Sequence, residues 1–301
     1  MTTAAIVVAL AGAACFGPSA SLAVQRLPPR HATWLISVGA VASALSGLVV
    51  QALLAFVVVG QLPLLADEGR WSSAALHHHA FTEPGVGVMS LVALTAAAVA
   101  LLLAGRRQAL ALTRAYRACR GMPGELVVLR DGPSSAVAVP GRPGRIVVAE
   151  SLLAALSADE RRVLLAHEQA HLEHGHHWHR TAVALAAAAN PLLAPLRGAI
   201  RYTTERWADE QAARRVGSRR AVATTVARVA LLTSARPGPM QLAAAAEAVP
   251  TRVAALLARP VRPRPLLSAA LIAIPLIAAL AAGLVWEQTE SLFDLAVRLY
   301  R

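Results

Sequence analysis

The chain contains no lysine, few acidic residues and few aromatic rings. All 29 basic residues are arginines, against 17 acidic residues, and aromatic side chains occupy 4% of the 301 positions. A surface that binds nucleic acid needs basic residues gathered with aromatic rings on which bases can stack. Many of the arginines flank apolar stretches instead, so we expect no direct binding to nucleic acid.

Cysteine is also scarce, which excludes a fold held together by disulfides. The two cysteines lie in different surroundings, Cys15 within an apolar segment and Cys119 within a basic one. A disulfide requires its two Cα atoms to lie within about 7 Å of each other. We therefore expect no disulfide, and a reduced thiol at Cys119.

Apolar residues, in contrast, are abundant. Hydrophobic residues make up 56% of the sequence, and the mean hydropathy of +0.52 is too high for an ordinary soluble domain. Four apolar stretches are long enough to cross a bilayer as helices, at about residues 4–24, 33–60, 85–104 and 266–286. The first could be a cleaved signal peptide, but no basic residue precedes Arg26, so we favour a retained helix.

The charges of the connecting segments predict the orientation of the chain in the membrane. Arginines follow the first and third apolar stretches and precede the fourth, whereas the 61–84 loop is net acidic. Arginine-rich loops are retained in the cytoplasm. We therefore expect residues 1–104 to carry three spans of a plasma-membrane protein whose N-terminus is outside. The 105–265 domain is then cytoplasmic, and residues 287–301 form a short extracytoplasmic tail.

A metal-binding pattern stands at residues 167–171, which read HEQAH. Ser157 and Glu160 form the pattern that caps the start of a helix. On that helix His167 and His171 lie four positions apart, on one face, where both imidazoles can bind the same Zn²⁺ ion. Glu168 follows the first histidine and can act as general base toward a water that zinc activates. A solvated helix with an accidental spacing is the alternative.

A second motif, on a helix expected from about residue 200 to Gly217, supplies the missing ligand. Glu205 can complete a shell of two histidines and one glutamate. Asp209, one turn later on the same face, can hold the far nitrogen of a ligating histidine. Tyr202 is a candidate for stabilising the oxyanion, with plain packing as the alternative. The histidines at positions 174, 176, 177 and 179 are expected to be mostly solvated rather than ligands.

HExxH followed by E-x-x-A-D in an apolar chain resembles the BlaR/MecR-type integral-membrane zinc metallopeptidases, relatives of the HtpX and CAAX-prenyl peptidases. Further likeness lies in the strand region before the zinc helix, its lead-in and an N-P-L element, at residues 138–141, 144–148, 156–160 and 190–192. The resemblance implies zinc held by His167, His171 and Glu205, with Glu168 as catalytic base. Known BlaR sensors carry a penicillin-binding domain after the last span. Residues 287–301 leave no room for one, so we expect no β-lactam receptor.

The remaining patterns predict a mainly helical membrane protein with a gluzincin-like α+β peptidase domain. β-branched runs predict a small sheet, with strands at about 126–129, 136–139 and 146–148. By resemblance, the strand at 136–140 is the edge to which an extended substrate adds. Prolines interrupt apolar residues 181–200, which favours a buried or membrane-grazing hairpin over a further span.

These patterns predict a zinc-dependent endopeptidase embedded in the lipid bilayer and acting on a protein or peptide. By analogy the substrate is a cytoplasmic transcriptional repressor or a membrane protein, cleaved in signalling or quality control. One alternative is a metal sensor or transporter, suggested by the histidines at 77–79 and 174–179. The other is an inactive peptidase-like scaffold. The apolar stretches contain no His, Asp or Glu, which argues against transport, and the intact Glu168 argues against a scaffold. No pattern points to a particular oligomeric state.

Overall fold

The computed structural model describes residues 2–122, 124–130, 135–234 and 249–300, and these are mostly helical. Four helices within them are long and apolar enough to cross a membrane. They are α1 (Thr2–Ala23), α2 (Pro29–Val59), α5 (Pro84–Ala118) and α12 (Pro265–Arg298). All four predicted apolar stretches therefore form helices, in the arrangement expected of a multi-pass membrane protein.

Two of these helices extend beyond their apolar parts. α5 continues through the arginines that follow residue 104 and ends at Ala118, because the residues there are mostly good helix formers. α12 continues to Arg298, so residues 287–298 are helical. The last turns of α12 pack Leu292 and Ala296 against Leu76 of α4 (Ser73–His79).

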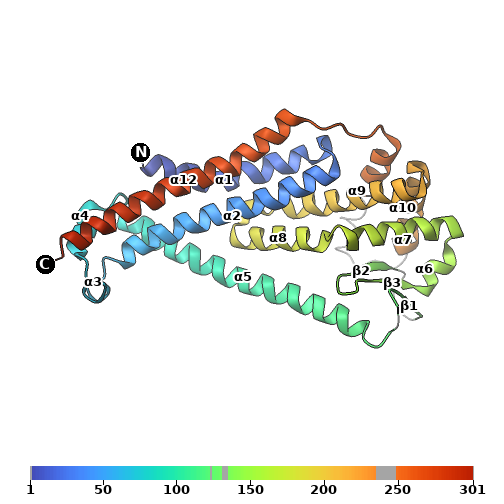
Figure 1. Ribbon diagram of the computed structural model, residues 1–301, viewed down its shortest axis with the longest axis horizontal. Coiled ribbons are helices and arrows are strands. Elements are labelled where there is room, and N and C mark those ends of the chain that lie inside the picture. Colours follow the sequence, from blue (N-terminus) through green and yellow to red (C-terminus); the bar gives the residue numbers. More distant parts are fainter. Residues whose placement is uncertain (1, 123, 131–134, 235–248, 301) are drawn as a thin grey trace.

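The connecting segments lie at two opposite ends of the helices (Figure 1). α4, the preceding α3 (Pro63–Gly69) and the C-terminus lie at one end. Thr2 Oγ1 donates to Gln288 Oε1 over 3.3 Å, which places the N-terminus toward that end too. The 3₁₀ segment η1 (Val24–Arg26) lies at the other end with the sheet. The arginine-bearing connections and the sheet thus share one side.

Small residues allow the spanning helices to approach closely. A Cβ atom added to Gly39 of α2 would lie 2.1 Å from Cζ of Phe16 on α1. One added to Gly12 would lie 2.5 Å from Cβ of Ala278 on α12. Lipid tails are as apolar as the helices, so close packing of this kind, rather than hydrophobic burial, holds such helices together.

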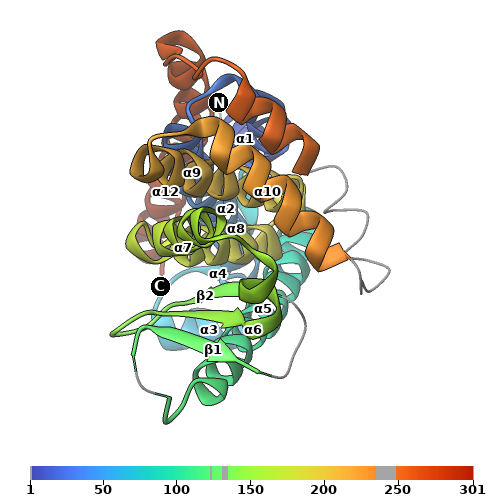
Figure 2. The ribbon, with the colours of Figure 1, turned by 90° about the vertical axis from the view of Figure 1, so that its right-hand side faces the viewer.

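The sheet has three short strands, β1 (Leu126–Leu129), β2 (Ala136–Val139) and β3 (Arg145–Ala149). Their order is β1-β3-β2, with β1 parallel and β2 antiparallel to β3. β2 is therefore an edge strand, and Figure 2 shows it as the strand nearest to α7 (Ala158–Glu173). A short helix, α6 (Glu150–Ala155), leads from β3 to α7.

After α7 the chain folds back among the spanning helices as a hairpin. It consists of α8 (His176–Ala189), η2 (Pro191–Leu193) and α9 (Leu196–Val216). At its tip, a Cβ added to Gly17 of α1 would lie 2.5 Å from the Leu192 carbonyl oxygen. At its base, Ser37 Oγ of α2 lies 2.9 Å from Nδ1 of His179. The hairpin tip is therefore seated against the apolar parts of α1 and α2.

Two further helical segments cover α7 and α9 on their other side. α10 (Arg219–Ser234) follows α9, and residues 249–257 are helical. Both pack against α7 and α9 through a small apolar cluster of Val163, Ala212, Val222 and Leu256. The space between α7, α9, β2 and these segments contains the candidate site.

Candidate active site

His167, His171 and Glu205 meet at one point between α7 and α9. The Nε2 atoms of the two histidines are 3.2 Å apart. Glu205 Oε2 lies 3.4 Å from Nε2 of His167, and Glu205 Oε1 lies 3.5 Å from Nε2 of His171. In the described part of the chain, no other group of at least three His, Cys, Asp or Glu residues converges in this way.

The spacing of the two imidazole nitrogens fits a tetrahedral zinc ion, and the Glu205 carboxylate lies within reach of the same point. With zinc bonds of about 2.0–2.1 Å, two ligand atoms of a tetrahedral shell lie about 3.3–3.4 Å apart. The two imidazole nitrogens lie 3.2 Å apart, and Glu205 approaches them at 3.4 and 3.5 Å through its two different oxygens. One ligand atom from each of the three residues lies within 4.8 Å of the other two. The donor set of two imidazoles and one carboxylate is also one that zinc uses when a fourth position stays open for water.

Each histidine of this pair is held through its other ring nitrogen. Asp209 Oδ1 lies 3.0 Å from Nδ1 of His167, and both residues are buried. His171 Nδ1 lies 2.7 Å from Nδ1 of His176. If His171 donates this hydrogen bond, its Nε2 keeps a free lone pair. Both contacts thus aim Nε2 at the shared point.

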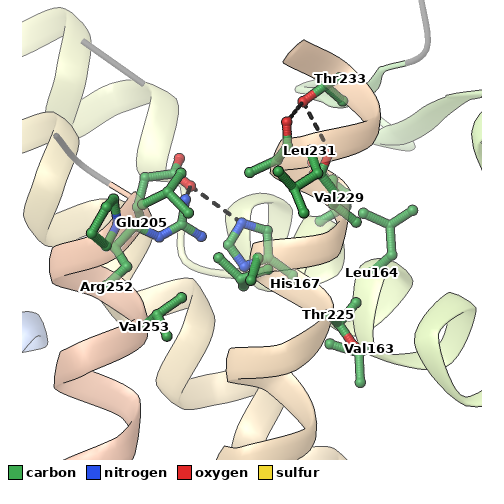
Figure 3. A pocket seen from close by; sticks show the side chains of 16 residues that line it. Val163, Leu164, His167, Glu205, Thr225, Val229, Leu231, Thr233, Arg252 and Val253 are labelled. Carbon is green, nitrogen blue, oxygen red and sulfur yellow. Dashed lines mark hydrogen bonds and ion pairs between the residues drawn. The ribbon is translucent and has the colours of Figure 1, made fainter. Parts of the chain in front are cut away.

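Two arginines bind the carboxylates of the site. Arg252 donates from Nε and Nη2 to the two oxygens of Asp209, at 2.8 and 2.7 Å, and its Nη1 lies 2.9 Å from Glu205 Oε2. Arg180 Nη2 donates to Glu205 Oε1 over 2.6 Å. Figure 3 shows Arg252 beside Glu205, with His167 on the other side of that carboxylate. The guanidinium groups therefore orient both carboxylates.

Burial and nearby charges set the protonation states of His167, His171 and Glu205. Burial alone would lower the pKa of His167, but Asp209 and Glu205 outweigh it and raise that pKa to about 10. Burial lowers the pKa of His171 to about 3, which keeps this ring neutral. Burial opposes ionisation of Glu205, yet Arg252 and the histidines hold its pKa well below the usual range. A cation bound by these atoms would replace the positive charge on His167.

Glu168 lies beside this group and lines two cavities. Its carboxylate is buried, which raises its pKa, and it accepts a hydrogen bond from the backbone N–H of Ala138 in β2. A cavity of about 300 Å³ separates β2 from the histidines. A second cavity of about 590 Å³, shown in Figure 3, is also lined by Glu168 and is mostly apolar. Val163, Leu164, Val226 and Val229 line this second cavity.

The family comparison agrees with this geometry. Residues 102–260 match Peptidase family M48, which is more than half of the chain. The chain belongs to peptidase family M48. Neither the curated proteins nor the solved structures contain a match.

Membership in M48 makes the chain a metallopeptidase, a class that is typically metal-dependent. The M48 region begins in the last part of α5 and extends over the sheet, α7 to α10 and the 249–257 segment. It therefore contains every residue of the site described above. The family match supports the predicted resemblance to membrane-type zinc metallopeptidases. The narrower BlaR/MecR assignment stays a prediction.

Two predictions about neighbouring residues need revision or further support. His176 and His179 were expected to be solvated, but both are buried, His176 against His171 and His179 against Ser37 and Trp34. The prediction is wrong for His176 and His179 because α8 packs against other helices, which bury these two side chains. Tyr202 is not brought to the site: it packs beside the apolar cluster of α1 and α2 and under the Arg206 guanidinium.

Sequence reasoning missed Arg252, Arg180 and His176 as parts of the site. The two arginines are not distinguished by spacing among the 29 in the chain. His176 belongs to a run of histidines whose directions depend on the sharp turn at Gly175, where φ is +59°. Only the folded arrangement of α8 and of residues 249–257 brings these side chains to the ligands.

Proposed function

We propose that this M48 chain is a membrane-embedded zinc endopeptidase in which His167, His171 and Glu205 hold the metal. The observation that carries the proposal is the convergence of the two imidazole nitrogens, 3.2 Å apart, with the Glu205 carboxylate, so that one ligand atom from each residue lies within 4.8 Å of the others. Zinc bound there would supply a Lewis acid that activates water and polarises a peptide carbonyl.

Glu168 is the general base of the proposed reaction. It is buried next to the ligands, and its raised pKa brings proton uptake closer to neutral pH. Glu168 takes a proton from the attacking water and passes it to the leaving amine. Asp209 and His176 hold the ligand histidines in place during these steps.

The edge of β2 is suited to bind the peptide backbone. Ala138 turns its N–H toward Glu168 and therefore away from β3. Backbone groups two residues apart in a strand point the same way, so Ala136 faces this edge too. An extended substrate can pair with Ala136 and with the Ala138 carbonyl, which face the same edge, across the cavity that β2 and α7 border. The apolar cavity that Glu168 also lines can accept an apolar side chain of the same peptide.

The orientation and the substrate class follow from the arginine distribution and the resemblance. The arginine-bearing connections lie at the same end as the catalytic residues, so we place the 105–265 domain in the cytoplasm and the N-terminus outside. The substrate would then be a cytoplasmic protein, such as a transcriptional repressor, or a cytoplasmic segment of a membrane protein.

The test compares the wild-type protein with a Glu168→Gln variant, both purified with bound zinc. Cleavage of casein, or of the chain itself, should fall at least about 100-fold in the variant, because the general base is lost. Zinc content, measured by atomic spectrometry, should stay unchanged because Glu168 is not a ligand. Equal cleavage by the two proteins would contradict the mechanism.

No observation favours the metal-transport alternative. In the described residues, the one group suited to a metal ion lies outside the four spanning helices. His77, in α4 at the far end of the spans, lies 3.3 Å from Gln61 Oε1 and edge-to-face against the His78 ring, with no carboxylate or thiol joining them in the described metal-binding groups. The buried position of Glu168 beside the ligands likewise favours an active enzyme over a scaffold.

A further inference from the structure

A separate cavity of about 430 Å³ lies where α5 meets the turn between β2 and β3. Four arginines line it: Arg117 in the last turn of α5, Arg120 just after that helix, Arg142 in the β2–β3 turn and Arg145 at the start of β3. Tyr116 and Thr113 add two hydroxyl groups. The described residues around the cavity include no carboxylate, and none of them belongs to the candidate active site.

The positive charge in this cavity is unbalanced. In the described part of the chain, Arg117, Arg120 and Arg142 form no ion pair, and Arg145 donates from Nη1 only to the Cys119 carbonyl oxygen. Seven other arginines of the M48 region each lie within 4.0 Å of a carboxylate. Arg117, Arg120 and Arg142 are exposed and Arg145 is half-buried, so four arginines beside one hollow leave a local excess of positive charge that a bound anion would lower.

We propose that this cavity binds an anion of the phosphate class. Guanidinium groups match phosphate oxygens in geometry and form paired, charge-assisted hydrogen bonds with them. The phosphate could belong to a lipid headgroup or to a small soluble molecule. A lipid source is reasonable because α5 leads from the apolar span through Arg106 and Arg107 to the cavity, and basic segments next to a span attract anionic lipids.

The position of the cavity connects it to the candidate active site. Val139, which lines the cavity, follows Ala138, the residue that donates to Glu168. Tyr116 of α5 already lies against the turn, since a Cβ added to Gly141 would be 2.7 Å from its hydroxyl oxygen. A bound anion would join the last turn of α5 to the β2–β3 turn and so hold the edge strand at a fixed position beside Glu168.

The experiment measures binding to the full-length protein with two probes. One is inorganic pyrophosphate, added to delipidated protein in uncharged detergent and read as a rise in melting temperature over chloride at equal ionic strength. The other is phosphatidylglycerol, compared with phosphatidylcholine by native mass spectrometry as the number of lipids retained. The test variant is Arg117→Gln/Arg142→Gln. The matched control is Arg214→Gln/Arg220→Gln, which removes the same charge from α9 and α10.

Wild type and the matched control should bind at least one probe, and the test variant should bind it about tenfold more weakly, since it loses charged hydrogen bonds. A response to pyrophosphate identifies a soluble phosphate, and a response to phosphatidylglycerol alone identifies a headgroup. If wild type responds to neither probe, or if both double variants weaken binding equally, the proposal is overturned. If the double variant does not fold, Arg142→Gln alone takes its place, with Arg220→Gln as its control, since both side chains are exposed.

Discussion

Asp209 contacts His167 from behind: its Oδ1 lies 3.0 Å from Nδ1 of the ring, whose Nε2 faces His171. The carboxylate is almost fully buried, and burial costs a charged group stability unless it has partners. Arg252 and His167 are those partners. Asp209 therefore connects the ligand His167 to Arg252, which belongs to the helical segment 249–257.

Replacing Asp209 should weaken metal binding without removing a ligand. We expect Asp209→Ala to lower zinc affinity about 10- to 100-fold, the usual cost of losing the partner of a ligating histidine. Glu205→Ala, which removes a proposed ligand, should lose zinc altogether. Competition with a chromophoric chelator measures both. If Glu205→Ala retained wild-type affinity, the proposed third ligand would be wrong.

Replacing Arg252 should destabilise the metal-free protein more than the zinc-loaded one. Arg252→Gln leaves the buried Asp209 carboxylate without its guanidinium partner, while the partly exposed Glu205 keeps Arg180. Breaking a buried ion pair costs about 3–5 kcal/mol. Zinc would restore part of that charge balance. Melting temperatures with and without a chelator should therefore differ more in Arg252→Gln than in wild type.

Arg180 provides the matched control for this comparison. It pairs with the same Glu205, but its side chain is 36% exposed, whereas that of Arg252 is 12% exposed. Water screens the exposed pair, so Arg180→Gln should shift the melting temperature less. An equal shift in the two variants would mean that burial of Arg252 is not what stabilises the site.

The edge of β2 can be tested at Ala138. Ala138→Pro removes the N–H that Glu168 accepts, and an edge position can take proline because this N–H does not pair with β3. We expect kcat/KM to fall about tenfold or more, the value of one hydrogen bond to a charged group. Zinc content should not change. Ala138→Gly keeps the N–H and should stay near wild-type activity; a similar loss in both would point to packing instead.

The proposed orientation predicts opposite labelling of two surface positions. Glu68→Cys lies in α3, and Arg220→Cys lies in α10, at the other end of the molecule. In a background without Cys15 and Cys119, a membrane-impermeant maleimide should label Glu68→Cys in intact cells. It should label Arg220→Cys only after the cells are permeabilised. The reverse pattern would invert the orientation.

Local signals were sufficient to predict α7 and the sheet. Ser157 and Glu160 form both hydrogen bonds of the predicted cap, and the strands begin and end within one residue of the predicted runs. α9 ends at Gly217, whose φ of +75° suits glycine. The cap, the strand positions and the helix end depend on residues close together in the sequence, so local patterns are enough to predict them.

The ends of the spanning helices were less predictable. Hydropathy marks where a helix is apolar, but α5 and α12 continue for several turns after the apolar residues end. Their extensions have contacts that hydropathy does not report: Tyr116 lies against the β2–β3 turn, and Leu292 packs under α4. Packing with distant residues decides how far each helix runs.

The sequence by itself determined that His167 and His171 share a helix face, that Glu205 and Asp209 share another, and that four stretches form long apolar helices. Each follows from a fixed spacing or a run of one residue type. Only the tertiary structure decided that the two helix faces meet at 3.4 and 3.5 Å, and that Arg252 and His176 complete the group. Those contacts join residues far apart in the chain, and no local spacing encodes the path that brings them together.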